Sequence, residues 1–106
     1  MTERTASEQI TAEVTSWPEV EAGSGRRGEL AFWVRGREVG HLHGDRAAHF
    51  MFPKEVGLRL TAQGRVVDHP VFPGKPGPAA RRIESAADVR DVIELLRLNY
   101  ERIVAR

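Results

Sequence analysis

The last part of the chain, SAADVRDVIELLRLNYERIVAR, constrains the fold most, because its apolar residues recur with the period of a helix. One continuous apolar stripe is formed by Val89, Val92, Ile93, Leu96, Tyr100, Ile103 and Val104. Ser85 is a good N-cap, and Asp88 lies in the first turn, where negative charge is favoured. The sequence therefore predicts a helix over Ala86–Ala105 that packs its stripe across an apolar layer.

That layer is predicted to be a sheet, because two neighbouring segments have the pattern of an antiparallel hairpin over Glu29–Gly44. ELAFWVRG and REVGHLHG are rich in β-branched and aromatic residues, which favour strands. Gly36 suits the first position of a two-residue type II′ turn, with Arg37 as the second. This turn would place Phe32 directly opposite His41.

The predicted register divides the side chains of the hairpin between two faces. One face carries Leu30, Phe32, Val34, Val39, His41 and His43. The other face carries Ala31, Trp33, Arg35, Glu38, Gly40 and Leu42. Glu38 is therefore expected to face away from the histidines and to pair with Arg35. A slip of one residue would exchange the faces of one strand, so the assignment depends on the turn.

Caps, breakers and periodicity predict the remaining elements. Thr5 and Glu8 have the spacing of a capping box, and Pro18 cannot continue the helix that they begin. The predicted elements are a helix over Ala6–Ser16, a strand over Glu19–Ala22, a short strand near Phe50–Phe52, a helix over Pro53–Gly64, a strand over Arg65–Phe72, a loop over Pro73–Pro78 and a strand over Ala80–Glu84. Residues 1–106 are thus expected to form one α+β domain in two layers, an antiparallel sheet of about four to six strands packed with helices.

Composition excludes several classes of function. The chain has no cysteine, so disulfides and thiolate metal sites are excluded. Its 16 basic and 15 acidic residues are interspersed, whereas nucleic-acid-binding proteins gather a basic excess on one face, so nucleic-acid binding is not expected. No apolar run approaches the roughly 18 residues of a membrane helix, and the polar start has no apolar signal segment. A cytoplasmic location without membrane association is therefore expected.

His41 and His43 are the leading candidates for a site. Two residues apart on a strand, they point to one face with Cα atoms about 6.5–7 Å apart, which lets two imidazoles ligate one ion. Zinc and similar divalent metals need three or four ligands, so His69 is the predicted third, with His49 or Asp45 as candidates for the rest. In a second interpretation the imidazoles pack in the fold with their nitrogens satisfied by backbone or water. In a third, His41, His43 and His69 line a hydrogen-bonding pocket for a small molecule without a metal.

The other motifs give little support to catalysis. Asp68 and His69 are adjacent on a predicted strand, so their side chains point to opposite faces. No serine adjoins a histidine in sequence, which leaves no evident nucleophilic pair. The stretch GSGRRG matches neither a P-loop nor a dinucleotide fingerprint and predicts a turn.

Two surfaces could receive a partner. Arg26–Arg27 and Arg81–Arg82 would form a basic patch for an anion if their loops converge. Leu95 and Leu98 lie beside the centre of the final stripe, so they are either buried or form a contact between two copies. A monomer or a homodimer is therefore expected.

Several motifs together resemble those of the luciferase-domain family of small proteins. The shared pieces fall at Gly36–Glu38, His41, His43, Phe52–Pro53, Gly64–Arg65, His69 and Leu95–Arg102. The resemblance covers most of the chain, from Ile10 to Arg102, and rests on the order and spacing of these pieces. Two features depart from the family pattern: PGKPGPAA lacks the tryptophan of Pro-x-x-Gly-Trp, and His49 stands where an acidic residue is expected. The element order is also similar to that of YjbR-like α+β proteins.

The resemblance brings no established reaction with it. A flavin-dependent luciferase built on a (β/α)₈ barrel needs roughly 200 residues or more, and this chain has 106. The leading prediction is a non-catalytic small-ligand-binding or accessory module with a histidine-lined pocket. The alternative is an enzyme that depends on a divalent metal such as zinc or uses histidine as a general base.

Overall fold

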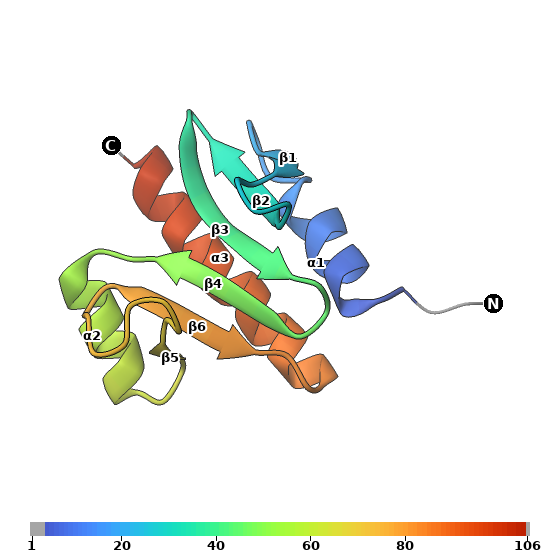
Figure 1. Ribbon diagram of the computed structural model, residues 1–106. Coiled ribbons are helices and arrows are strands. Elements are labelled where there is room, and N and C mark those ends of the chain that lie inside the picture. The colour runs from blue at the N-terminus through green and yellow to red at the C-terminus, as the bar shows by residue number, and fades with distance from the viewer. Residues whose placement is uncertain (1–3, 106) are drawn as a thin grey trace.

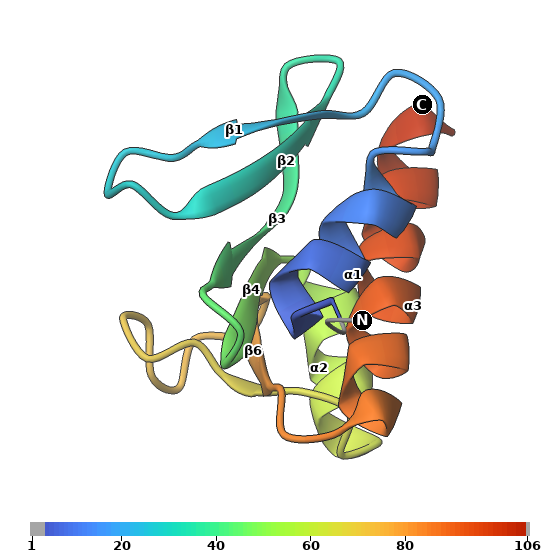
Figure 2. The same ribbon diagram turned by 90° about the vertical axis from the view of Figure 1, so that its right-hand side faces the viewer.

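The computed structural model describes residues 4–105 and has the predicted α+β architecture in two layers (Figure 1). The elements in chain order are α1 (Ala6–Val14), β1 (Glu21–Ser24), β2 (Leu30–Val34), β3 (Arg37–His43), β4 (Ala47–Met51), α2 (Lys54–Ala62), β5 (Val67–Asp68), β6 (Pro78–Arg82) and α3 (Ala86–Val104). All three helices lie on one side of the sheet (Figure 2). The opposite face of the sheet is covered by no helix of the described chain, and we call it the open face.

The six strands form one antiparallel sheet in the order β1-β2-β3-β4-β6-β5. β4 pairs with both β3 and β6 and begins at Ala47, so it is longer and earlier than the short strand predicted near Phe50–Phe52. β5 has two residues in place of the strand predicted over Arg65–Phe72, because the chain turns after His69. The main-chain N–H of Phe72 donates to the His69 carbonyl at 3.0 Å in that turn.

Most other boundaries are within two or three residues of the prediction. The capping box on α1 is confirmed, with Thr5 N–H donating to Glu8 Oε1 at 2.8 Å and Glu8 N–H to Thr5 Oγ1 at 3.1 Å. β1 starts two residues after the predicted Glu19, because Glu19 has a φ of 68° and belongs to the preceding turn. Within residues 4–105 the structure has no helix long and apolar enough to cross a membrane.

The turn of the β2–β3 hairpin differs from the predicted one. Arg35 and Gly36 form it, with φ values of 52° and 76°, and Val34 pairs with Arg37. Positive φ at both central residues defines a type I′ turn, whose twist matches that of the flanking strands. The prediction of a type II′ turn at Gly36 and Arg37 was therefore wrong by one residue.

A β-bulge then shifts the register of β3 a second time. Trp33 pairs with Glu38, whereas the preceding residue, Phe32, pairs with Gly40. Val39 is the extra residue, and it is fully buried in the core. A bulge of this kind leaves two residues of one strand opposite one residue of the other.

The bulge reverses the predicted face of the histidines, because the displaced turn alone moves the register by two residues and leaves the faces unchanged. His41 pairs with Ala31 and not with Phe32. Residues directly opposite each other share a face, so His41 and His43 lie with Trp33 on the open side of the sheet. The prediction that they share a face with Phe32 was wrong.

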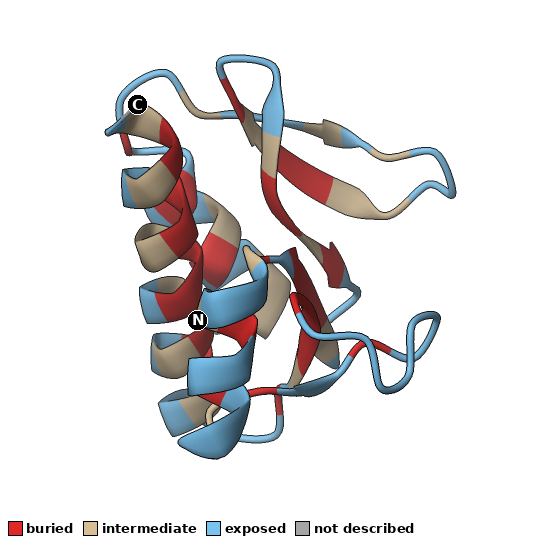
Figure 3. Cartoon of the chain, turned by 90° about the vertical axis from the view of Figure 1, so that its left-hand side faces the viewer, coloured by how far each residue is buried: buried red, intermediate tan, exposed pale blue. Residues whose placement is uncertain are grey.

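The core fills the space between the sheet and the helices (Figure 3). α3 supplies its longest face, with Val89, Val92, Leu95, Leu96, Asn99, Tyr100 and Ile103 buried, which confirms most of the predicted stripe. Leu95 is fully buried, so of the two interpretations of that residue, burial or a contact between two copies, the first is confirmed. Ser85 caps α3 as predicted, its Oγ accepting from Asp88 N–H at 3.2 Å. Buried apolar area of this kind is the main source of stability.

Candidate histidine site

All four histidines of the chain meet on the open face of the sheet. His41 and His43 lie on β3, His49 lies on β4 directly opposite His41, and His69 follows β5. The ring centroid of His49 is 5.1 Å from that of His41, 4.2 Å from that of His43 and 4.3 Å from that of His69. We call these four residues the histidine cluster, and His49 is its centre.

Glu38 holds the ring of His41, with its Oε2 2.9 Å from His41 Nδ1. This contact corrects the expectation that Glu38 faces away from the histidines and pairs with Arg35. The guanidinium of Arg35 instead lies 3.0 Å from Glu19. The bulge at Val39 is the reason, because it brings Glu38 and His41 to the same face. A carboxylate on Nδ1 orients the imidazole and directs Nε2 to a ligand.

His49 is buried and neutral at pH 7. Its pKa is lowered from 6.5 to about 4, first because burial penalises the charged form and then because His43 and His69 would add like charges. Its Nδ1 has no hydrogen-bond partner within the part of the chain that the structure describes. A neutral imidazole keeps one nitrogen with an available electron pair, which is the form that binds a metal or accepts a hydrogen bond.

His69 is buried as well, and burial is the main reason that its pKa is lowered. Its Nδ1 accepts a hydrogen bond from the main-chain N–H of Val71 at 3.1 Å. The neutral ring therefore carries its proton on Nε2. Metal binding at either nitrogen of His69 requires the Val71 N–H to give up this acceptor: directly if the metal binds Nδ1, or because the proton moves to Nδ1 if the metal binds Nε2.

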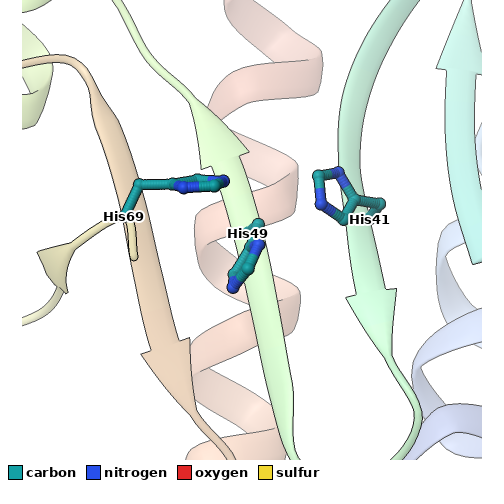
Figure 4. Close-up of side chains that lie close together, drawn as sticks. All are labelled: His41, His49 and His69. Carbon is teal, nitrogen blue, oxygen red and sulfur yellow. The ribbon is translucent and has the colours of Figure 1, made fainter. Parts of the chain in front are cut away.

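Three members of the cluster could hold a metal ion: His41, His49 and His69 (Figure 4). One nitrogen from each lies within 4.8 Å of the other two. Tetrahedral zinc with Zn–N bonds of about 2.0–2.1 Å needs nitrogens about 3.3 Å apart. The two nitrogens that lie farthest apart must therefore approach each other by up to about 1.5 Å. Rotation of the side chains can supply this movement.

His43 was predicted as a member of the metal trio, and the structure places it beside that trio. Its ring contacts those of both His41 and His49. From the sequence His49 is only a further candidate, because the short strand predicted near Phe50–Phe52 does not include it. Recognising β4 as a strand opposite β3 would have aligned His49 with His41.

The histidine cluster forms part of the lining of a pocket with a volume of about 450 Å³. Glu38, Trp33 and Glu29 line it beside the cluster, and Arg27 lines it from the β1–β2 turn. The pKa of Glu29 is lowered, chiefly because its carboxylate accepts the main-chain N–H of Arg27 at 3.1 Å. The pocket thus combines the neutral imidazole of His49 with charged groups at its margin.

Other candidates from the sequence lie outside this pocket. Asp45 does not reach the cluster, since its Oδ1 accepts from the main-chain N–H of Ser7 at 2.8 Å. Asp68 is turned away from His69, because its Oδ2 accepts from Gly74 N–H at 2.9 Å.

Arg81 does not contribute a free positive charge to the predicted basic patch, because its guanidinium is already paired. Its guanidinium lies 2.7 Å from both Asp88 and Asp91 and donates to the Arg65 carbonyl at 3.0 Å. These partners, the hydrogen bond to Asp88 first, raise the pKa of Arg81. This ion pair network ties β6 to the start of α3 and has a structural role.

A larger hollow of about 640 Å³ lies over the outer faces of α1 and α3. Its polar groups already have partners: Trp17 donates its indole N–H to Glu13 at 3.0 Å, and Arg97 pairs with Glu101 at 3.0 Å. The Arg97 guanidinium also lies 5.1 Å from the rings of Trp17 and Tyr100. The histidine pocket is therefore the better candidate, since its nitrogens include an unpartnered one.

Comparison with known proteins gives one match. No curated protein and no solved structure matched the chain, and the similarity to YjbR-like proteins stays a prediction. A comparison with protein families matches residues 36–99 to the luciferase domain, which is more than half of the 106 residues. That segment contains the whole histidine cluster and the bulge that orients it. The chain belongs to the luciferase-domain family.

Proposed function

We propose that the chain is a non-catalytic binding module whose histidine pocket holds a divalent metal such as zinc and, through it, a small molecule. The observation that carries this proposal is the approach of nitrogens from His41, His49 and His69 to within 4.8 Å of one another. No other histidine, cysteine or carboxylate group within residues 4–105 forms a comparable cluster.

The surroundings of the trio fit such an ion. Three imidazoles are a ligand set that zinc uses in open sites, with the fourth position left to water or a ligand. Glu38 on Nδ1 of His41 is the carboxylate partner that metal-bound histidines commonly have. Because the pKa of His49 is about 4, protons do not compete for its nitrogen at pH 7. An ion bound at Nδ1 of His49 would also give this buried nitrogen the partner that it lacks.

Isothermal titration with zinc chloride of the untagged chain, after chelator treatment, tests the proposal. We expect one zinc ion per chain, and a loss of affinity of at least tenfold in His49→Ala. His43→Ala is the matched control, because His43 touches the trio but does not belong to it. Absence of zinc binding by the wild-type chain would contradict the proposal, and an equal loss in both variants would contradict the trio.

A histidine-based or metal-dependent enzyme is the second candidate. The observation in its favour is the pair of Glu38 and His41, since a carboxylate on Nδ1 is the arrangement of a histidine general base. Turnover of an ester or phosphoester substrate panel by the zinc-loaded chain, abolished in His41→Ala, would favour the enzyme. Binding of small molecules without turnover would favour the binding module.

A further inference from the structure

The rim of the histidine pocket has one cationic side and one apolar side. Arg26 and Arg27 line it from the turn between β1 and β2. Met51, Val71 and Phe72 line it from β4 and from the turn after β5. A ligand that filled this pocket would therefore meet both kinds of surface above the histidine cluster.

The acidic and the basic side chains at the rim differ in whether they have a partner. Both carboxylates are engaged, Glu38 by the ring of His41 and Glu29 by the main-chain N–H of Arg27. The side chains of Arg26 and Arg27, in contrast, make no hydrogen bond or ion pair with any residue from 4 to 105. Formally the two arginines offset the two glutamates, so a bound divalent ion would give the pocket a net charge of about +2.

The apolar side is unusually exposed. Among residues 4–105 five large hydrophobic side chains are exposed, and three of them, Met51 at 47%, Val71 at 52% and Phe72 at 38%, line this pocket. An apolar patch beside polar, convergent groups is typical of a ligand site. A ligand with an apolar body would remove these surfaces from water.

We propose that the pocket binds a small monocarboxylate with an apolar body, its carboxylate on the metal beside Arg27 and its apolar part against Val71 and Phe72. A carboxylate fits both the open position of a zinc ion and a guanidinium. This inference rests on the proposed function, because the carboxylate is held partly by the metal.

Phenylacetate is a suitable probe. Acetate is the control that has the carboxylate but no apolar body, and phenylacetamide is the control that has the apolar body but no charge. Titration calorimetry of the zinc-loaded full chain is expected to give phenylacetate at least tenfold tighter binding than either control. Arg27→Ala should weaken phenylacetate at least threefold and leave zinc binding within twofold. Phe72→Ala should weaken phenylacetate and leave acetate unchanged. Both residues are at the rim, so these variants are expected to fold.

The outcomes separate the inference from the proposed function. If zinc binds but phenylacetate binds no more tightly than acetate or phenylacetamide, the inference is overturned and the metal site stands. Equal binding of phenylacetate to the zinc-free chain would overturn the role of the metal in holding the carboxylate. If zinc itself does not bind, the proposed function fails and the inference fails with it.

Discussion

The side-chain amide of Asn99 donates a 2.8 Å hydrogen bond to the main-chain carbonyl of Val39, joining the core side of α3 to the bulge in β3. Asn99 is fully buried, and its Oδ1 accepts from Arg102 Nε at 3.0 Å. The bulge decides which face of the sheet carries His41. A residue on the helical side of the molecule therefore supports the orientation of a site on the opposite side.

Removing this amide should destabilise the fold. Asn99→Ala leaves the Val39 carbonyl buried without its partner, which costs about 1–3 kcal/mol in the free energy of unfolding. Arg90→Ala, on an exposed position of the same helix, is the control and should change it by less than about 0.5 kcal/mol. Urea denaturation at pH 7 measures both variants, and equal values for the two would show that the hydrogen bond is unimportant.

Gly40 lies against the core with no room for a side chain. A Cβ there would be 2.6 Å from Leu96 Cδ2 and 3.0 Å from the His49 carbonyl. Gly40→Ala should therefore lower the free energy of unfolding by about 1–3 kcal/mol. Gly23→Ala is the matched strand control, because a Cβ at Gly23 meets nothing within 4 Å. The prediction fails if both variants melt at the same temperature in a thermal scan.

Replacing His49 should stabilise the metal-free chain and remove zinc binding. Its Nδ1 is buried without a partner, so His49→Leu removes an unsatisfied polar group and is expected to raise the free energy of unfolding of the metal-free chain by about 1 kcal/mol, or roughly 4 °C in Tm. The same variant should lose zinc binding. Thermal scans with and without zinc measure the two effects, and a variant less stable than wild type without metal would assign His49 a packing role instead.

Acid should destabilise the metal-free chain through His49. Its pKa of about 4 in the folded chain lies below the ordinary value of 6.5, so the unfolded chain takes up a proton first as the pH falls. Stability is therefore fully present above about pH 6.5 and falls by up to about 3 kcal/mol as the pH approaches 4. His69, whose pKa is also lowered, acts in the same direction.

The pH effect can be assigned by urea denaturation between pH 7.5 and 4.5 in the presence of chelator. His49→Leu should flatten the decline, because it removes the group with the larger shift. A wild-type chain whose stability is constant over this range would contradict the lowered pKa.

Glu38 should tune the affinity for zinc. Removing a carboxylate that orients a metal-bound histidine commonly weakens binding by about 10–100-fold, so we expect such a loss in Glu38→Ala. Glu21→Ala, which removes an exposed carboxylate from β1, is the control for net charge. Competition with a chromogenic chelator measures both, and matching affinities would leave Glu38 without a positioning role.

Local signals predicted the regular elements well. The Ser85 cap and the apolar stripe defined α3 to within one residue at its end, and the Thr5–Glu8 capping box defined the start of α1. These signals succeed because a cap or a stripe is a relation between residues three or four positions apart in the sequence. The short strand β4 was predicted poorly, because its five residues show no clear alternation and depend on pairing with β3 and β6.

The α+β fold, and the shared face of His41 and His43 on one strand, could be predicted from the residues alone. Which face that is, and which residues join the two histidines there, depends on pairing between strands. The type I′ turn at Arg35 and Gly36 and the bulge at Val39 set the register. Strand register is a long-range choice, and one displaced residue reverses every side chain. A second pairing, of β4 with β3, places His49 opposite His41, and no pattern within β4 alone indicates it.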